Sequence, residues 1–359
     1  MASERRRPTI IDIAKRAQVS FKTVSRVLNE NPRVDPALRS RVIEAMTELD
    51  YHPNLAARSL AGRRGYAIAL LIDQTELFSE QDANSYFAPY LVDLQAGALL
   101  ACLEAGYHFF IEPYDPRSPS FPNDLRAQLS KLALDGVVLA PPAADRRELL
   151  DALEAWEIPY VRIAPGLDVE RAPSVATDEH NGTLAMAEYL LSLGHRRIGF
   201  VTGPEAHIAA AIRLVAFRDA VGADAELIVH PGDFSFASGM AAGETLLGLP
   251  QPPTAIFAAN DFMAAGVIAA ATRLGLRVPQ DVSIAGFDDS AVAHFVWPPL
   301  TTVHQPIRAM ARAAIEYLVA LASGSSTREE RVEFPPTLVV RESTASTKAA
   351  PTASAKPGA

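Results

Sequence analysis

The sequence has a single cysteine and no long apolar run, and each shortage excludes a class of protein. Cys102 is the one thiol in 359 residues, so the chain cannot form an internal disulfide, as is typical of proteins in a reducing cytosol. No run of about eighteen apolar residues is present to span a bilayer, and the start MASERRRPTI lacks the apolar segment of an export signal. We therefore expect a cytoplasmic protein with no membrane partner.

Motifs for catalysis and cofactor binding are also missing. We find no G-x-G-x-x-G after the first apolar strand, no phosphate-binding G-x-x-x-x-G-K-[ST] and no H-E-x-x-H. None of the eight histidines has a partner at metal-ligand spacing on a helix or strand face. The sequence therefore predicts no catalytic residues, no metal site and no cofactor.

The charge is divided unevenly along the chain. Residues 1–65 hold 13 lysines and arginines against 7 acidic residues, a net charge of +6, although the whole chain carries −9. The rest of the chain therefore carries −15. A small basic head on a large acidic body is expected when one segment binds phosphates and the other does not.

Three short helices are predicted in the basic head, residues 1–52. Thr9 and Asp12 have the spacing of a capping box, Ser20 stands at the start of a second helix, and Asp35 precedes a third. Because so tight a turn joins the first two helices, the second should cross the first at a large angle and protrude. The apolar residues expected in the shared core are Ile10, Ile13, Ala14, Ala17, Val24, Val27, Leu28, Leu38, Val42, Met46 and Leu49.

The outward face of the second helix carries hydroxyl, amide and basic side chains. No acidic residue lies between Gln18 and Asn29, so nothing in this stretch would repel a DNA backbone. Such side chains suit phosphate oxygens and the guanine edge in the major groove; the alternative is an ordinary three-helix bundle with a solvated polar face. The candidate DNA-binding residues of the head are Thr9, Ser20, Phe21, Lys22, Thr23, Ser25, Arg26 and Asn29.

The run DIAKRAQVSFKTVSRVLNENPRVDPALRSRVIEAMTELDYHPNLAARSLAGRR closely resembles the head of the lactose and galactose repressor (LacI/GalR) family over about fifty residues. The resemblance implies a helix-turn-helix domain that binds double-stranded operator DNA. One departure is Gln18, which stands where the family usually has glycine in the turn between the helices. Some backbone strain is therefore expected at Gln18.

Residues 53–65 contain the signals of a short helix, from Pro53 to Gly62, that is too short to fold alone. The resemblance implies a hinge helix that forms only on the operator, with a leucine wedged into the central base step of the minor groove. Leu60 occupies that position and Ala57 lies one turn earlier. Two hinges from a homodimer would then bind a palindrome with a central CpG.

From residue 66 to residue 341, short apolar runs alternate with amphipathic helical patterns, and the last expected strand is VEFPPTLVV. This order predicts parallel sheets with crossover helices. We expect two similar halves, residues 66–165 and 166–300, with late segments crossing between them. The fold class is therefore an all-α three-helix helix-turn-helix domain with a hinge helix, followed by an α/β domain of two Rossmann-like subdomains that resembles periplasmic sugar-binding proteins.

Polar residues that follow the strands of the body are candidates for effector binding, because open α/β sheets bind ligands beyond the carboxyl ends of their strands. We assign Asp261 to a helix cap and Asn260 to the ligand. The resemblance implies that Arg213, Asn260 and Asp288 hold effector hydroxyls or a carboxylate, and that Phe234 packs on the ligand. The candidate effector-binding residues are Asp73, Arg213, Phe234, Asn260, Asp288 and Gln305.

The candidate effector-binding residues and their neighbours also indicate which class of effector the chain binds. Asp73 and Gln305 could equally be solvated loop residues, but a carboxylate, an amide and a guanidinium together suit a polyol. Ala143 and Ala144 stand where lactose-type repressors carry an acid, so a simple galactoside is not expected. The stretch NSYFAPYLVDLQAGALLACLEAGYHFFIEPYDP resembles a branch of the family found near glycoside-uptake genes, which favours a glucoside or oligosaccharide.

Residues 342–359 are rich in Ala, Ser, Thr and Pro without apolar periodicity, which predicts a disordered tail. The leucine heptad that joins two dimers in some relatives is absent, so a homodimer with its interface on the body is expected. The sequence favours a repressor of carbohydrate-utilisation genes controlled by a sugar-like effector. Two alternatives stay open: a regulator controlled by a protein partner or by a non-sugar effector such as a purine, and an enzyme or transport receptor fused to a DNA-binding head.

Overall fold

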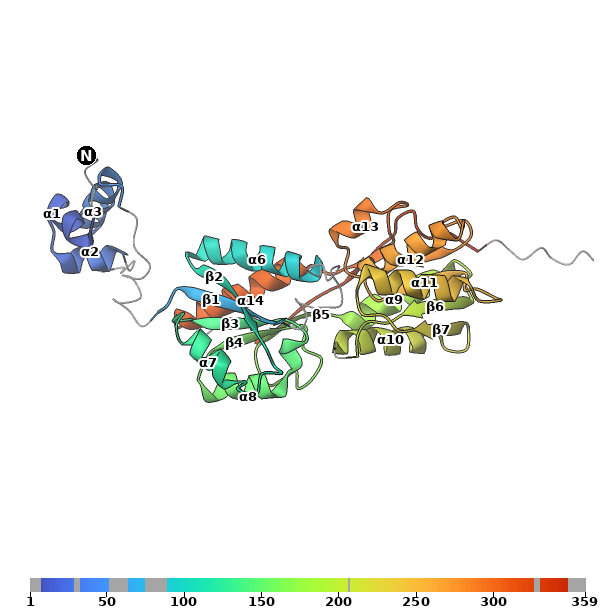
Figure 1. Ribbon diagram of the computed structural model, residues 1–359. Coiled ribbons are helices and arrows are strands. Elements are labelled where there is room, and N and C mark those ends of the chain that lie inside the picture. The colour runs from blue at the N-terminus through green and yellow to red at the C-terminus, as the bar shows by residue number, and fades with distance from the viewer. Residues whose placement is uncertain are drawn as a thin grey trace, which may run out of the picture. The chain divides into compact units, whose positions relative to one another are not determined.

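The computed structural model describes residues 8–28, 33–51, 64–74, 89–205, 207–325 and 330–347 (Figure 1). The chain divides into two compact units, one of residues 1–67 with 127–135 and one of residues 68–126 with 136–359. In the described part of the chain, no helix combines the length and the apolar character needed to cross a membrane.

The head is a three-helix unit, as the sequence predicts. Its helices are α1 (Ile10–Arg16), α2 (Phe21–Leu28) and α3 (Pro36–Glu48). Fully or almost fully buried apolar side chains from all three helices form one core, so a segment of this size can hold a protruding helix in place. The core residues are Ile13, Ala14, Ala17, Val24, Val27, Val42, Ala45 and Tyr51.

The expected helix starts are confirmed by their hydrogen bonds. Asp12 Oδ2 accepts from the backbone amide of Thr9 at 2.8 Å and from its hydroxyl at 2.7 Å. Ser20 Oγ accepts from the amide of Thr23 at 3.1 Å. Asp35 Oδ1 accepts from the amide of Ala37 at 2.9 Å, so the first turn of each helix has a side-chain acceptor of the predicted kind.

The turn between α1 and α2 has the strain predicted at Gln18. Gln18 has φ +50°, in the left-handed region that favours glycine. Arg41 on α3 lies across this turn, and its Nη2 donates to the carbonyl of Ala17 at 2.6 Å and to that of Gln18 at 3.1 Å. These two hydrogen bonds help to hold the strained turn closed.

The first half of the body is built on a parallel sheet with the strand order β2-β1-β3-β4-β5-β11. Helices α6 and α14 pack together on one face, and α8 lies on the other (Figure 1). The strands are β1 (Ala67–Asp73), β2 (His108–Tyr114), β3 (Gly136–Leu139), β4 (Tyr160–Ile163), β5 (Ser174–Thr177) and β11 (Arg331–Phe334). The helices are α6 (Pro89–Ala105), α7 (Asn123–Leu129), the short 3-10 helix η1 (Ala143–Asp145), α8 (Arg147–Ala155) and α14 (Ile307–Ala322).

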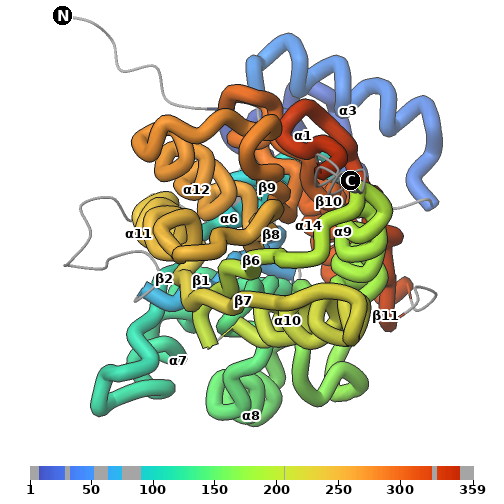
Figure 2. The backbone as a smooth tube through the Cα atoms, turned by 90° about the vertical axis from the view of Figure 1, so that its right-hand side faces the viewer, coloured from blue at the N-terminus to red at the C-terminus, as the bar shows by residue number. Residues whose placement is uncertain are grey.

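The second half repeats this topology on a smaller scale, with the parallel order β7-β6-β8-β9. Helices α9 and α10 pack as one pair and α11 and α12 as another (Figure 2). The strands are β6 (Arg197–Val201), β7 (Glu226–His230), β8 (Ala255–Ala258) and β9 (Ser283–Ala285). The helices are α9 (Glu179–Ser192), α10 (Ile208–Val221), α11 (Phe236–Leu247), α12 (Asp261–Arg273) and α13 (Ala291–Phe295). In both sheets the first strand lies between the second and the third, so the prediction of two similar halves is confirmed.

The boundary between the halves differs from the expected residue 166. Strand β5 still belongs to the first sheet, so the chain passes to the second half only after Thr177. The expected late crossing is present, because α14 and β11 return to the first half. VEFPPTLVV is two strands and not one: β11 pairs with β5, while β12 (Thr337–Val339) pairs antiparallel with β10 (Thr302–His304). The two prolines between them have no amide hydrogen with which to continue a ladder.

The predicted start of the disordered tail at residue 342 is wrong. Ser343 is fully buried; its hydroxyl donates to the carbonyl of Ile284 and accepts from the amide of Thr301 at 2.8 Å. The amide of Thr347 donates to the carbonyl of Leu193 at 2.9 Å. Small hydroxyl side chains order this segment through hydrogen bonds, without the apolar periodicity that the prediction required. Residues 348–359 lie outside the described residues.

Candidate DNA-binding face and effector site

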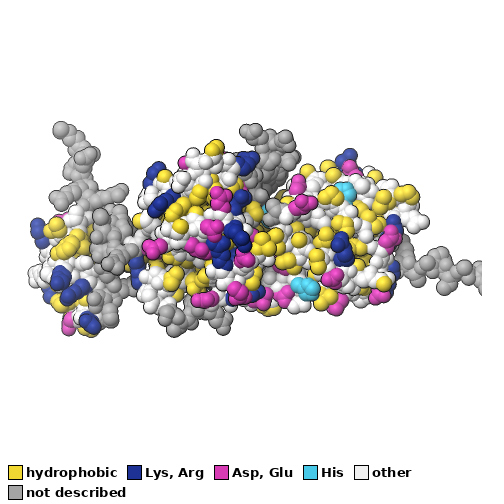
Figure 3. Space-filling model, turned by 90° about the horizontal axis from the view of Figure 1, so that it is seen from below, with side chains coloured by type: hydrophobic (Ala, Val, Ile, Leu, Met, Phe, Trp, Pro, Cys, Tyr) yellow, Lys and Arg dark blue, Asp and Glu magenta, His cyan; other side chains and the backbone are white. Residues whose placement is uncertain are grey.

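Helix α2 turns one apolar and one polar face in opposite directions. Val24 and Val27 are buried in the head core, whereas Phe21 is 56% exposed and Lys22 and Arg26 are exposed. Thr23 and Ser25 are half-buried. Lysine and arginine side chains are visible on the described surface of the head, while acidic and basic side chains are interspersed on the face of the body drawn in Figure 3. The outward face of α2 therefore has the composition that contact with a nucleic acid backbone requires.

The other predicted DNA-binding residues either make hydrogen bonds within the head or lie outside the described residues. The hydroxyl of Thr9 is bonded to Asp12, and the hydroxyls of Ser20 and Thr23 lie 2.8 Å apart, so these three residues also shape the helix starts. Asn29, Ala57 and Leu60 lie outside the described residues. The DNA contacts of all these residues stay a prediction.

The centre of the candidate effector site is Arg213 on α10, of which only 4% is exposed. Its Nε donates to Glu179 Oε2 at 2.6 Å and its Nη2 to Glu179 Oε1 at 3.1 Å. Its Nη1 donates to the carbonyl of Ala259 and lies 3.8 Å from Asp288 Oδ1. The ring of Phe287 covers the guanidinium, with its centroid 3.8 Å from Cζ. Burial lowers the pKa of Arg213, but the two carboxylates outweigh it and the net shift is upward, so the side chain stays charged.

Asp288 and Gln305, both candidates from the sequence, meet beside this arginine. Gln305 Nε2 donates to Asp288 Oδ1 at 2.8 Å, and both residues are buried. Asp288 has φ +111°, a backbone conformation that only its surroundings can hold in place. Burial raises the pKa of Asp288 to about 7, and the nearby charge of Arg213 opposes the rise.

The cap of α12 is Asn260 and not Asp261, to which the sequence analysis assigned it. Asn260 is the N-cap of α12: its Oδ1 accepts from the amide of Met263 at 2.9 Å, and its Nδ2 donates to the carbonyl of Phe234 at 3.0 Å. Asp261 lies in the first turn and accepts from the amide of Ser290 at 2.7 Å and from the hydroxyl of Thr302 at 2.6 Å. Asp261 therefore holds the loop that carries Asp288, and the assignment of Asp261 to the cap was wrong because an N-cap must precede the first helical residue.

Phe234 lies at a close approach of the backbone. It has φ +69°, and a Cβ atom at Gly203 would lie 2.3 Å from its ring, so only glycine fits opposite. The ring is perpendicular to that of His207, with centroids 5.3 Å apart. This places Phe234 next to the start of α10, the helix that carries Arg213.

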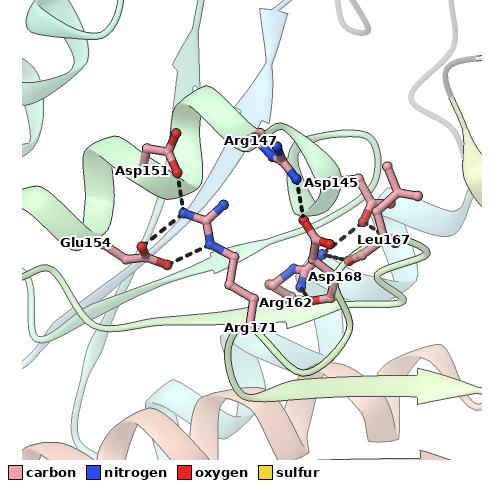
Figure 4. Close-up of polar contacts among 8 residues, drawn as sticks. All are labelled: Asp145, Arg147, Asp151, Glu154, Arg162, Leu167, Asp168 and Arg171. Atoms are coloured by element: carbon pink, nitrogen blue, oxygen red, sulfur yellow. Dashed lines mark hydrogen bonds and ion pairs between the residues drawn. The ribbon is translucent and has the colours of Figure 1, made fainter.

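In the first half, the strand ends carry ion pairs between arginine and aspartate. Asp73, at the end of β1, is buried and pairs with Arg146 at 2.8 Å. Arg162 on β4 is fully buried and pairs with Asp145 at 3.0 Å. Figure 4 shows Arg162 enclosed by Asp145 and by the loop that contains Leu167 and Asp168, whose carbonyls accept from its guanidinium. This network fixes the loops that follow β3 and β4.

Sequence reasoning missed Glu179 and Tyr90. Glu179 follows β5, a four-residue strand that the sequence analysis did not recognise, so the residue did not stand out as a strand-end carboxylate. Tyr90, in the first turn of α6, has a buried hydroxyl for which no hydrogen-bond partner lies among the described residues. Burial raises the pKa of Tyr90, and the charges of Glu179 and Asp288 raise it further.

The assembled groups are suited to binding rather than to chemistry. They provide carboxylate and amide acceptors, one charged guanidinium and two aromatic rings. Among the residues that the structure describes, no group of three His, Cys, Asp or Glu side chains is placed to hold a metal ion. A ligand with hydroxyl groups and an apolar face is complementary to this set.

The head and the body of the chain each match a known protein family. Residues 9–54 match the family described as bacterial regulatory proteins, lacI family, and residues 187–344 match a periplasmic binding protein-like domain. The chain is 35% identical over 345 residues to the HTH-type transcriptional regulator CelR of Thermobifida fusca, covering 94% of this chain and 99% of that protein. It is 34% identical over 348 residues to the HTH-type transcriptional repressor PurR of Klebsiella pneumoniae, covering 94% and 97%.

Two solved structures share the fold over almost the whole chain. A complex of the regulator CelR with cellobiose superposes with a TM-score of 0.68 at 33% identity, covering 94% of this chain and 100% of that one. The lac repressor dimer bound to operator and the anti-inducer ONPF superposes with a TM-score of 0.75 at 26% identity, covering 95% and 100%.

Proposed function

The chain belongs to the LacI family of bacterial regulatory proteins, and from this premise we propose that it represses carbohydrate-utilisation genes under the control of a sugar-like effector. It is a DNA-binding transcription regulator and not an enzyme. Its site of action is then the bacterial cytoplasm, where operator DNA lies.

The observation that carries DNA binding is the two-faced helix α2. Its buried valines anchor it to the head, and its outward face presents Lys22 and Arg26. A helix held in this way can enter the major groove with its basic and hydroxyl side chains toward bases and phosphates. The hinge residues Ala57 and Leu60 would add contacts in the minor groove, at the central CpG of a palindrome.

Effector control is supported by the buried cluster of Arg213, Glu179 and Asp288. Ionisable side chains whose pKa values are shifted by burial and by each other's charge are typical of functional sites. The pKa values of Arg213 and Asp288 are both shifted in this way, which favours a ligand-binding role. The relative CelR was solved with cellobiose, which supports a glucoside or oligosaccharide for this chain. A non-sugar effector such as a purine is the alternative that the sequence leaves open.

A homodimer is supported by an apolar strip on the outer face of α6. Val92, Leu99, Leu100 and Leu103 are between 45% and 63% exposed. Exposed apolar side chains that recur along one helix are typical of an interface between subunits. Sedimentation of a Leu103→Lys variant should show a weaker dimer. A dimer of unchanged strength would show that α6 does not form the interface.

The experiment that tests the function combines DNA and effector. Fluorescence anisotropy on a palindromic operator with a central CpG should show tight binding that weakens steeply with salt. Thermal unfolding against a panel of neutral sugars and purines should identify the effector, since a ligand at one hundred times its Kd adds about 2.7 kcal/mol to stability. If none of these sugars and purines changes the affinity for the operator, a protein partner would be favoured as the regulator.

A further inference from the structure

One carboxylate holds the chain at the point where the hinge segment, residues 53–65, joins the first sheet. Asp135 Oδ1 accepts from the backbone amide of Gly65 at 2.8 Å, and Asp135 Oδ2 accepts from the amide of Tyr66 at 2.8 Å. The backbone amide of Asp135 donates in turn to the carbonyl of Ala67 at 2.8 Å. One residue therefore binds three consecutive residues, and it uses both carboxylate oxygens, which an amide side chain with a single acceptor oxygen cannot reproduce.

The backbone is strained on both sides of this contact. Tyr66 has φ +52° and Ala133 has φ +47°, in the left-handed region that residues with a Cβ atom avoid. The two segments approach so closely that a Cβ atom at Gly65 would lie 1.4 Å from the carbonyl oxygen of Ala133. Such conformations persist only where surrounding contacts hold them, and they cluster at functional sites. The hydrogen bonds of Asp135 are contacts of this kind for Tyr66.

The carboxylate itself is attached to a rigid part of the first half. Asp135 directly precedes β3, and β3 pairs in parallel with β1 (Figure 1), beginning with Gly136 opposite Ile68. Every residue of both strands is buried. Core strands of this kind are the parts of a fold that open least. The sheet therefore fixes the position of Asp135, and the contact extends this order to residues 65 and 66.

The contact lies close in sequence to the expected hinge helix. That helix is expected to end at Gly62, three residues before Gly65, which is about 11 Å of fully extended chain at most. So short a link cannot absorb a change in the backbone of residues 65 and 66, whereas a longer link would average it out. Two hinges that must meet in one minor groove therefore depend on where each chain leaves its first sheet.

We propose that Asp135 is a positioning residue for operator binding: it fixes the backbone of Gly65 and Tyr66 and, through this short link, the placement of the hinge. In this role Asp135 contacts neither DNA nor effector. Without it, the hinge leaves the sheet in many directions and has to be ordered at the moment of binding, which lowers the affinity. The inference rests on the proposed hinge and adds a residue of the body on which the hinge depends.

The first test compares Asp135→Asn with a matched control in the full chain. The variant keeps the shape of the side chain but has one acceptor oxygen for two amides. Affinity for the palindromic operator should therefore fall at least about fivefold, while affinity for a nonspecific duplex stays unchanged. Asp281→Asn is the control, because Asp281 Oδ2 also accepts from a backbone amide, that of Arg277 at 2.9 Å, in the second half.

Fluorescence anisotropy at one salt concentration measures both affinities, and urea unfolding shows that the variants are folded. A purely structural role of Asp135 would lower the urea midpoint without changing the ratio of operator to nonspecific affinity. Operator affinity in Asp135→Asn equal to that of the control, or an unchanged ratio, overturns the inference.

The second test asks whether Asp135 acts through the hinge. Gly65→Ala forces the same contact apart from its other side, so it should lower operator affinity as Asp135→Asn does. Adding Asp135→Asn to Leu60→Ala should lower the affinity further by less than about twofold, because both changes act on one element. Additive losses, or wild-type operator binding by Gly65→Ala, overturn the inference and leave the hinge standing. Wild-type binding by Leu60→Ala overturns the proposed hinge and the inference with it, a result that differs from all the others.

Discussion

Arg213 and Glu179 form a buried ion pair with two hydrogen bonds, Nε to Oε2 at 2.6 Å and Nη2 to Oε1 at 3.1 Å. Glu179 opens α9, directly after the chain has left the first sheet at β5, and Arg213 lies on α10. The pair therefore joins the crossover between the two halves to the helix that carries the central arginine of the candidate effector site.

Removing the carboxylate of this pair should be strongly destabilising. Glu179→Ala leaves the charge of Arg213 buried with only the more distant Asp288 as a partner, and breaking a buried pair in this way costs about 3–5 kcal/mol. Glu244→Ala is the control, because its pair with Arg273 is largely exposed and should contribute less than about 1 kcal/mol. Urea unfolding of the three proteins measures both values. Equal losses in the two variants would show that the buried pair has no special role.

The raised pKa of Asp288 predicts how stability depends on pH. Burial raises it to about 7 from the ordinary value of 3.8, so the folded state binds a proton that the unfolded state releases. The resulting stabilisation is complete below the unfolded pKa and is lost as the pH rises through about 7. The free energy of unfolding should therefore fall between about pH 5 and about pH 8, and should fall less in Asp288→Asn. A residual slope is expected because the pKa of buried Asp261 is also raised. Urea midpoints at both pH values test this, and identical slopes in the two proteins would contradict it.

Replacing Arg26 by alanine should weaken operator binding without affecting the fold. The side chain is exposed on α2, and loss of a groove contact typically costs about 1–3 kcal/mol. Arg273→Ala removes an exposed arginine from the body and should leave the affinity unchanged. Anisotropy titrations at one salt concentration compare the variants. If Arg26→Ala binds the operator with wild-type affinity, Arg26 does not contact the DNA.

The strained turn of the head should respond to Gln18→Gly and Arg41→Ala in opposite directions. Glycine relieves the cost of φ +50°, a gain of up to about 1 kcal/mol after its greater unfolded-state entropy is counted. Arg41→Ala removes two hydrogen bonds to the turn and should loosen it. Amide hydrogen exchange of α1 and α2 in the full chain reports both effects. Faster exchange in Gln18→Gly would show that the turn is not strained.

Leu60→Ala tests the predicted hinge. If a leucine unstacks the central step, the variant should lose most of its specific affinity and DNA bending, yet keep salt-dependent nonspecific binding through its basic residues. The assay measures bending and affinity on one operator with the central CpG varied. Wild-type bending by the variant would restrict operator recognition to the two helix-turn-helix domains.

The sequence alone determined the local elements of this protein. The capping residues Thr9, Ser20 and Asp35 begin helices where they were expected, because an N-cap depends on bonds within three residues. The apolar residues of the head also form its core as predicted, because their helical spacing depends only on residues close together in the sequence. The family resemblance rests on this segment, and the match of residues 9–54 to the LacI family confirms it.

Part of the candidate effector site could also be predicted from the sequence. Asp288 and Gln305 were selected and lie in contact at 2.8 Å, with Arg213 beside them. Asn260 and Asp261 were both singled out, but the cap was assigned to Asp261 and is Asn260, because a shift of one residue at a helix start decides which side chain caps. The role of each of these residues in effector binding stays a prediction.

Only the tertiary structure decided which distant segments meet. The strand β5, with four residues, and its partner β11 carry no signal strong enough to place them in the first sheet, and they pair across more than 150 positions of the chain. Glu179 on α9 meets Arg213 on α10, so no local pattern could join them. Ser343 is ordered by hydrogen bonds to Ile284 and Thr301, although its own segment lacks apolar periodicity. The physical reason is the same in each case: capping and periodicity are encoded by neighbours in sequence, whereas burial and ion pairing depend on partners that only folding brings together.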